Sequence, residues 1–306
     1  MGTSRSFPVL LALAVVLASP AAKADAPSTR FFFAPRDGEV WIEKLLDTRS
    51  TDPGGDAAVH TEETSETDTL LYAKQGDGWR VTRVMGPAHM EVGGLPLDNP
   101  ILKMSRGTHI ELSCDENGVA HEVKGYRLLL RRLERSLSPE VWGKYQNSVT
   151  LQGVSHTEIR RWNLRRGGLI GAEVKDGEIW NYQSLFPTTM GFLEVRGTMR
   201  FGGMIDFEGQ RGYKIFLEFA TGSKDLTSKD ATREIDLRPA GYTSINSDQY
   251  GLTGSTIRMI DPATGHMLYE NTKASWKEPE MRGAEKMVDK SLQMIYRLEP
   301  VSSSSP

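Results

Sequence analysis

One stretch of this chain, residues 125–166, has the residue spacing of helices, and patterns typical of β-strands lie on both sides of it. Within it, apolar residues recur at spacings of three and four, and arginines fill most of the positions between them. This spacing predicts an amphipathic helix over residues 126–137. The apolar positions are Tyr126, Leu129, Leu130, Leu133 and Leu137. A single helical segment between two β-rich parts indicates an α+β fold.

Two further helices are predicted in the same segment. Ser138-Pro139 ends the first helix and starts a second, because proline fits only the first turn of a helix and serine caps the free amides there. A third helix is predicted to begin at Ser155, which stands at capping-box spacing from Glu158, and to end at Gly167-Gly168. The segment is therefore expected to hold three short helices.

The charge of the helical segment differs from that of the rest of the chain. Residues 126–166 contain nine Lys/Arg and three Asp/Glu, a net charge of +6, in a chain whose formal net charge is −3. A basic helical face suits an anionic membrane surface or an acidic protein partner. The candidate contacts are Arg131, Arg132, Arg160 and Arg161. The alternative is a solvated outer face on helices whose leucines pack against a sheet.

Strand patterns fill both flanking parts. In the first part they cover residues 40–42, 60–74, 79–84 and 109–113, with turns at 75–78 and 115–118. In the second part, apolar and polar residues alternate over 193–201, 215–219 and 288–298. Glycines inside these strands, at Gly197, Gly202-Gly203 and Gly212, favour bulges and bends. We therefore expect mainly antiparallel β structure, in two curved β-rich halves that flank the central helical segment.

The beginning of the chain resembles an export signal. Arg5 precedes an apolar run over residues 7–18, and Ala22-Lys23-Ala24 is a small-x-small cleavage site. We expect a mature protein that starts at Asp25 and is periplasmic or secreted, with no transmembrane span after cleavage, because no later stretch approaches the roughly 20 apolar residues of a span. The expected organisation is a signal peptide (1–24), a first β-rich half (25–124), a central helical segment (125–168), a second β-rich half (169–300) and a disordered tail (301–306).

The two halves share a short pattern. Asp176-Gly177-Glu178-Ile179-Trp180 nearly repeats Asp37-Gly38-Glu39-Val40-Trp41. Late in each half there is also an aspartate-to-glycine turn, over residues 115–118 and 261–265. These correspondences favour two halves of similar construction.

With these marks in place, the chain resembles a family of uncharacterised exported bacterial β-rich proteins, a domain of unknown function. The residues that carry the resemblance are Gly118, Gly125, Gly177, Trp180, Asp261 and Gly265. In layout the chain is also similar to periplasmic half-barrels that carry lipids or lipoproteins. The resemblance implies a fold and a compartment, and it implies no activity and no functional residue.

Motifs for catalysis and cofactors are not found in the sequence. It contains no P-loop, no nucleophile elbow and no dinucleotide-binding glycine motif, so no cofactor is expected. His121-Glu122 begins like a zinc-binding helix, but Gly125 stands where the second histidine would be. The single cysteine, Cys114, is expected to be a small core residue. An enzyme is therefore the less favoured interpretation.

Two other sets of residues receive structural interpretations. The acidic residues Glu62, Glu63, Glu66 and Asp68 alternate along a strand, which indicates a solvated edge strand. Five tryptophans are expected mostly in the core, with a ligand groove as the alternative, and they are Trp41, Trp79, Trp162, Trp180 and Trp276.

Three functional hypotheses follow. The first is non-catalytic binding of a hydrophobic ligand, a lipid or a lipid-modified partner between the curved sheets and the apolar helix face, in the cell envelope. The second is an interaction module that docks an acidic partner through its basic helical face, and the third is an enzyme with an unrecognised site. Nucleic acid is not an expected partner, because the chain is acidic overall and carries an export signal.

Overall fold

The computed structural model describes residues 27–146, 150–166, 169–188, 191–222, 226–238, 249–280 and 286–301. The predicted signal peptide and most of the predicted tail lie outside these residues.

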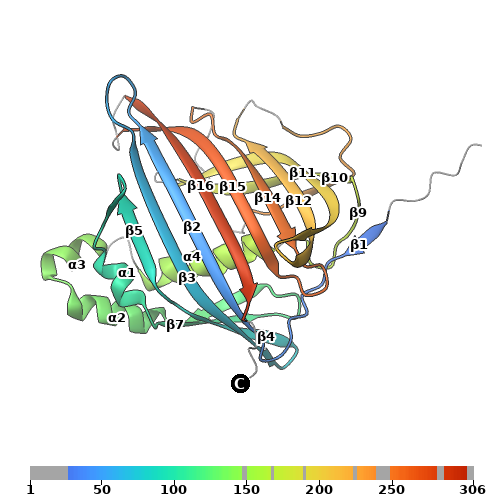
Figure 1. Cartoon of the computed structure of the whole chain (residues 1–306), viewed down its shortest axis with the longest axis horizontal. Coiled ribbons are helices and arrows are strands. Elements are labelled where there is room, and N and C mark those ends of the chain that lie inside the picture. Colours follow the sequence, from blue (N-terminus) through green and yellow to red (C-terminus); the bar gives the residue numbers. More distant parts are fainter. Residues whose placement is uncertain are drawn as a thin grey trace, which may run out of the picture.

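In the part of the chain that the structure describes, fourteen strands form one open sheet (Figure 1), in which neighbours run antiparallel except for the parallel pair β10 and β13. The strands of the second half, in spatial order, are β13 (Arg233–Asp236), β10 (Ile179–Thr188), β11 (Gly191–Phe207), β12 (Gln210–Ala220), β14 (Thr253–Ile260), β15 (Met267–Pro279) and β16 (Met287–Pro300). Those of the first half continue as β2 (Val40–Asp52), β3 (His60–Gln75), β4 (Gly78–Val84), β7 (His109–Cys114) and β8 (Ala120–Lys124), with β5 (Ala88–Val92) paired to β3 and β6 (Leu95–Pro96) paired to β5. The predicted class, α+β and mainly antiparallel β, is confirmed.

The two halves are joined by backbone hydrogen bonding between strands at opposite ends of the chain. Strand β16 pairs with β2 along twelve residues, with Tyr296 opposite Leu45 and Leu292 opposite Arg49. The sequence left open whether the halves form one sheet system or two. The pairing of β16 with β2 makes them one sheet, and a separate small ribbon joins β1 (Ser28–Arg30) to β9 (Glu173–Lys175).

The strands follow the alternation in the sequence. In β12, Ile215, Leu217 and Phe219 are all buried on one face, as the apolar alternation predicts. The glycine prediction is confirmed at the pairing of β11 with β12, whose register shifts between Phe201 and Gly203. Close packing explains Gly197, because a Cβ there would lie 1.7 Å from the carbonyl oxygen of Glu218.

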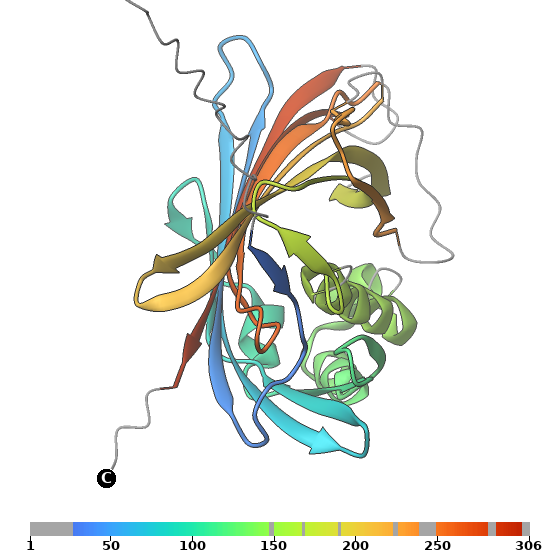
Figure 2. The same ribbon diagram turned by 90° about the vertical axis from the view of Figure 1, so that its right-hand side faces the viewer.

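Four helices are described, α1 (Pro100–Ser105), α2 (Tyr126–Ser136), α3 (Pro139–Tyr145) and α4 (Leu151–Arg166), and Figure 2 shows α2, α3 and α4 on one side of the sheet. The three predicted helices of the central segment are confirmed. Ser138 caps α3, accepting a hydrogen bond from the Val141 amide. The predicted start at Ser155 is wrong: α4 begins four residues earlier, because the Thr150 hydroxyl already accepts a hydrogen bond from the Gly153 amide at 3.0 Å. The short helix α1 was not predicted.

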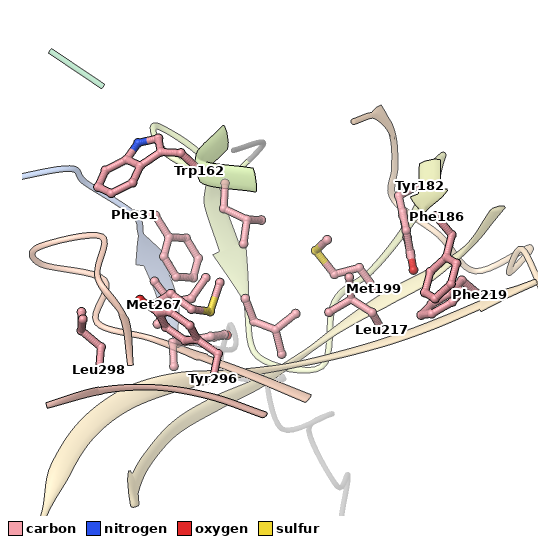
Figure 3. Packing of buried hydrophobic residues seen from close by; sticks show 14 of the residues in the cluster. Phe31, Trp162, Tyr182, Phe186, Met199, Leu217, Phe219, Met267, Tyr296 and Leu298 are labelled. Atoms are coloured by element: carbon pink, nitrogen blue, oxygen red, sulfur yellow. The ribbon is translucent and has the colours of Figure 1, made fainter. Parts of the chain in front are cut away.

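The main core lies between the sheet, α4 and the N-terminal segment around Phe31 (Figure 3). The tryptophans belong to it as expected, since Trp79, Trp162, Trp180 and Trp276 are buried and Trp41 is partly buried against them. A second cluster holds α2, whose Leu129 and Leu133 pack with Ile110.

Two glycines of the shared turn pattern are explained by the packing of that N-terminal segment. Gly118 and Gly265 both have positive φ, 76° and 73°. A Cβ would lie 2.5 Å from the ring of Phe33 in the first case and 2.4 Å from the carbonyl oxygen of Phe32 in the second. The two turns therefore pack against the same N-terminal segment, and their glycines have a structural role.

Candidate functional site

A cavity of about 410 Å³ lies between α4 and the face of the sheet that it covers. Its lining comes from α4 and from β2, β10, β11, β12, β14, β15 and β16. Most of the lining surface is apolar, supplied mainly by Leu185, Phe186, Phe192, Val195, Leu217 and Phe219. The cavity thus spans the second half of the sheet and reaches the seam with the first half.

Helix α4 forms one wall of the cavity with a regular set of residues. Thr157, Arg160, Arg161, Leu164 and Arg165 line it. Their spacing places them on one face of the helix. In most helices that cover a sheet this face is apolar, whereas here three of the five side chains are arginines.

The opposite side of α4 is fixed to the β7–β8 hairpin. The indole nitrogen of Trp162 donates to the Gly118 carbonyl oxygen at 2.8 Å. The side-chain amide of Asn163 bonds both backbone groups of Ala120, accepting from its N–H at 2.8 Å and donating to its carbonyl at 3.0 Å. These directional contacts set the rotation of the helix about its axis, so its arginines face the sheet.

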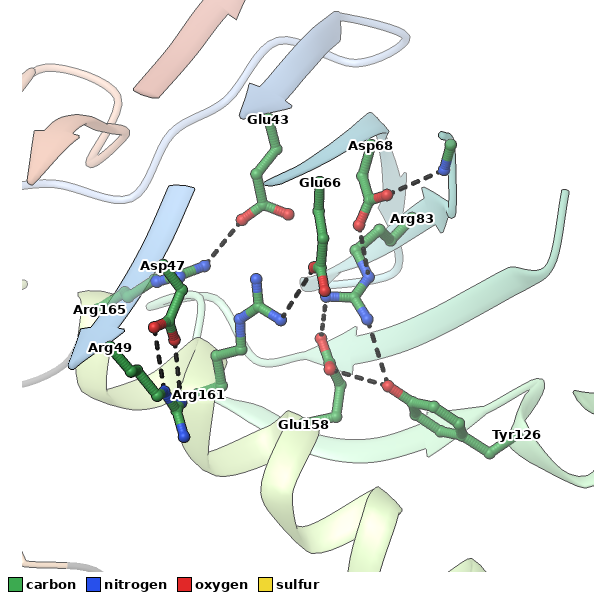
Figure 4. A network of polar contacts seen from close by, with 11 residues as sticks. Glu43, Asp47, Arg49, Glu66, Asp68, Arg83, Tyr126, Glu158, Arg161 and Arg165 are labelled. Carbon is green, nitrogen blue, oxygen red and sulfur yellow. Dashed lines mark hydrogen bonds and ion pairs between the residues drawn. The ribbon is translucent and has the colours of Figure 1, made fainter. Parts of the chain in front are cut away.

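Three arginines meet carboxylates of β2 and β3 beneath the helix (Figure 4). Arg165 pairs with Glu43 at 2.9 Å, and Arg161 lies 3.9 Å from Glu66. Arg83, from β4, completes the network with three contacts, to Glu158 at 3.1 Å, to Asp68 at 3.5 Å and to the Tyr126 hydroxyl at 3.2 Å.

Burial shifts the protonation equilibria in this network. The pKa of Asp68 is raised, first because burial disfavours the carboxylate, although Arg83 opposes the shift. The pKa of Tyr126 is also raised, by burial and then by the charge of Glu158. The pKa of Arg165 is lowered by its burial and next by the nearby charge of Arg161. Two cations of α4 therefore lie close enough to repel each other.

The four arginines predicted as one basic face are separated by the fold. Arg131 and Arg132 are exposed on α2, where Arg132 donates to the Met104 carbonyl oxygen at 2.9 Å. Arg160 is buried and Arg161 is half-buried, and both face the cavity. The expectation of a shared exposed face is therefore wrong for Arg160 and Arg161, because the contacts of Trp162 and Asn163 turn their side of α4 inward.

The prediction that Glu62, Glu63, Glu66 and Asp68 lie on a solvated edge strand is also wrong. Strand β3 is not an edge strand, since it lies between β2 on one side and β4 and β5 on the other. Asp68 is 5% exposed, and Glu66 faces Arg161. The signal that would have indicated this is a charge at an inward position of an alternating strand: Asp68 stands two residues before the buried Leu70, and Arg83 two residues after the buried Val81.

The remaining chemical candidates stay apart from this cavity. Cys114 is buried in β7, and His121 lies on the neighbouring strand β8. Within the described part of the chain, no group of three or more His, Cys, Asp or Glu is arranged to hold a metal ion. Of the helices that the structure describes, none is both long and apolar enough to cross a membrane.

Comparison with protein-family models finds no match, and neither does comparison with curated protein sequences. Solved structures do match. A structure of lipovitellin, titled for its lipid–protein interactions, has a TM-score of 0.45 and 10% identity over 89% of this chain, which spans only 26% of the lipovitellin chain.

Two other matches cover most of both chains. A domain from Vibrio parahaemolyticus described as outer membrane lipoprotein-sorting has a TM-score of 0.20 at 11% identity, over 86% of this chain and 87% of that one. A DUF1329 family protein from Desulfovibrio piger has a TM-score of 0.14 at 10% identity, over 88% of each. The matches thus include both kinds of protein that the sequence resembles. With TM-scores below 0.5, none of them supports an argument about function.

Proposed function

We propose that this protein binds a hydrophobic ligand, such as a lipid or the acyl chain of a lipid-modified partner, in the cavity between α4 and the sheet, without catalysing a reaction on it. The observation that carries this proposal is the cavity itself. Its volume of about 410 Å³ falls in the range of roughly 300–1,000 Å³ that is typical of small-molecule sites, and its lining is mostly apolar. Export to the cell envelope, expected from the residues before Asp25, belongs to the same proposal.

The titratable groups that converge in this fold favour binding over catalysis. A cleft with perturbed titratable groups would favour an enzyme. Here Arg83, Asp68, Glu158 and Tyr126 do converge, but each is 9% exposed or less and none lines the cavity. Groups with a shifted pKa that do line the cavity include Arg49 and Arg165, and an arginine stays protonated in a protein, so it does not act as a general acid or base. Their contacts with one another account for them as a structural network that fixes α4 on the sheet.

Ligand retention by the native protein is the first test. Native mass spectrometry of protein purified from its own cell envelope should show added mass in the range of a lipid, and extraction with organic solvent should remove that mass. A protein that carries no added mass, even under gentle ionisation, and that takes up no acyl probe afterwards would contradict the proposal.

Filling the cavity is the second test, and the chain offers a matched pair of variants. Ser184 lines the cavity, whereas Ser275 is exposed on the outer face of β15. Ser184→Trp should reduce binding of a fluorescent acyl probe at least tenfold, because the indole occupies the space of the ligand. Ser275→Trp should bind the probe as the wild type does. Thermal melts of both variants establish that they are folded, and equal binding by folded Ser184→Trp and wild type would place the ligand elsewhere.

A further inference from the structure

The cavity has a cationic wall opposite its apolar floor. Arg160, Arg161 and Arg165 line it from α4, while Leu217 and Phe219 line it from β12. Burying a charge without compensation is costly, so three inward arginines on one helix need negative partners. The number and distance of the carboxylates near these arginines therefore determine which charge on a ligand the cavity accepts.

The side chains that line the cavity carry more arginines than carboxylates. Among the residues that the structure describes, the lining holds five arginines, Arg49 and Arg258 in addition to the three of α4, and two carboxylates, a net charge of +3. Both carboxylates are already engaged, Asp47 with Arg49 at 2.9 Å and Glu270 with Arg258 at 2.6 Å. The lining carboxylates therefore do not neutralise the arginines of α4.

Two of the arginines of α4 face carboxylates behind the lining. Arg165 pairs closely with Glu43, at 2.9 Å, whereas Arg161 lies at the longer distance of 3.9 Å from Glu66 and keeps 28% of its side chain exposed. The pKa of Arg49 is raised first by its hydrogen bond with Asp47, and the charges of Glu62 and Glu278 add to this shift, so these two carboxylates also act on this region. A guanidinium at 3.9 Å from one carboxylate is free to form the shorter, two-point contacts that it makes best with an oxyanion.

Arg160 is set at the junction between the cationic and apolar parts. Its guanidinium stacks 3.6 Å from the centroid of the Phe192 ring and donates to the Leu185 carbonyl oxygen at 3.4 Å. Both Phe192 and Leu185 line the apolar part of the cavity. A ligand whose chain lies along Leu185 and Phe192 therefore brings its end to the guanidinium groups of α4.

We propose that the ligand is an anionic amphiphile, a long acyl or alkyl chain that ends in a carboxylate or phosphate group. This inference rests on the proposed function. The chain lies against β10, β11 and β12, and the head group is held by Arg160 and Arg161. Such a head group also reduces the repulsion between Arg161 and Arg165, which contributes to the lowered pKa of Arg165. A cationic amphiphile would increase that repulsion and is excluded by the same reasoning.

The test compares ligands of one chain length and different charge. Delipidated full-length mature protein is titrated with hexadecanoate, hexadecyl phosphate, hexadecanol and hexadecylamine, and bound ligand is measured by native mass spectrometry and by displacement of a neutral acyl probe. Both anions should bind at least tenfold more tightly than the alcohol, and the amine should bind most weakly. Tight binding of only one of the two anions would still support the proposal and would identify the head group.

Two variants assign the head group to α4, with a matched control on α2. Arg161→Gln and Arg160→Gln should each abolish most of the preference for anions and leave the affinity for hexadecanol within about threefold of the wild type. Arg131→Gln, which removes an exposed arginine outside the cavity, should keep the preference. If buried Arg160→Gln fails to fold in a thermal melt, the half-exposed Arg161→Gln decides the test.

The outcomes separate this inference from the proposed function. Equal affinity for the anions and the alcohol, or an anion preference that survives in Arg161→Gln, would overturn the anionic head-group site and leave hydrophobic binding intact. Failure of all four ligands and of the neutral probe to bind would overturn both.

Discussion

Arg83 is a buried cation with several polar partners. It is 4% exposed and contacts two carboxylates and a phenol, so one cation is shared by Asp68, Glu158 and Tyr126. Removing one partner of a buried ion pair typically costs about 3–5 kcal/mol, because the other charge stays buried and uncompensated. A network of this kind defines where α4 sits more than it adds to overall stability.

Asp68 gives this network a pH dependence with a defined sign. Its pKa is raised by burial, so the folded protein binds the proton more tightly than the unfolded protein does. The contribution of this proton to the free energy of unfolding is present in full below the unfolded pKa, about 4, and is lost as the pH rises through the higher folded pKa. Relative to Asp68→Asn, the wild type should therefore lose stability between pH 4 and pH 7.

Urea unfolding of both proteins at several pH values in this range measures that difference. Asp98→Asn, which removes an exposed carboxylate paired with Lys103, is the control variant for the loss of a carboxylate at the surface. A difference for Asp68→Asn that stays constant, or that grows in favour of the wild type as the pH rises, would show that the carboxylate is not disfavoured by burial.

At the scale of single elements, a glycine in a turn can meet two separate requirements. One is a positive φ, which costs a residue with a Cβ roughly 1–2 kcal/mol, and the other is close packing. Gly177 and Gly265 both have positive φ, 82° and 73°. A Cβ at Gly177 would meet nothing within 4 Å, whereas at Gly265 it would lie 2.4 Å from the backbone oxygen of Phe32.

This pair separates backbone conformation from steric contact. Gly177→Ala should lower the free energy of unfolding by about 1–2 kcal/mol, the cost of the conformation alone. Gly265→Ala should cost clearly more, because backbone atoms of the segment around Phe32 have to move. Chemical denaturation measures the loss in free energy of unfolding for each variant. Equal losses would mean that the turn at Gly265 does not pack tightly against that segment.

Of the four arginines predicted as a basic face, Arg131 and Arg132 on α2 are exposed. We propose that Arg131 and Arg132 contact an anionic membrane surface, where each basic residue contributes about 1 kcal/mol. Replacing both with Gln should leave the thermal midpoint nearly unchanged, because exposed charges add little stability. Co-sedimentation with anionic vesicles should weaken by roughly tenfold or more at low salt, an effect that salt reduces in the wild type.

The control for this experiment is a second pair of exposed arginines. Arg200 and Arg211 are exposed on β11 and β12, so their double Gln variant removes the same charge from another surface. If the wild type does not co-sediment with anionic vesicles, or if both double variants lose binding equally, then Arg131 and Arg132 do not form a specific contact surface.

At the scale of the whole molecule, the seam between β16 and β2 decides how the chain unfolds. The predicted segments 25–124 and 169–300 share one sheet. The main core joins them to the helical segment 125–168, since it contains Leu70, Trp162 and Leu217. We propose that they form one folding unit. A destabilising change in one half should then reduce the protection of amides in the other.

Leu217→Ala tests this cooperativity. Leu217 is 4% exposed, and truncating such a leucine typically costs about 2–5 kcal/mol. Hydrogen exchange followed by mass spectrometry should show that the slowest amides of β3 and of β12 lose protection by a similar factor, while Arg200→Ala on the outer face changes neither. Loss of protection confined to β10, β11, β12 and β14 would show that the halves unfold separately.

The local pattern of the sequence determined the class of fold and most of its elements. Alternation predicted the inward rows of β12 and β16, and the three-four spacing and Ser138-Pro139 predicted α2 and α3, because these signals depend on neighbours within one strand or one helical turn. The strand glycines likewise predicted the irregular register of β11 with β12.

Only the tertiary structure decided which charges are buried. Arg131 and Arg160 occur in similar arginine-rich surroundings in the sequence, yet one is exposed and the other faces the cavity. The difference arises from contacts between distant residues: Arg165 and Glu43, which pair beneath α4, are 122 residues apart. A helix pattern specifies which side chains share a face, whereas the packing partner determines whether that face meets water, carboxylates or a ligand. For this reason the cavity and its cationic wall appeared only when α4 was placed on the sheet.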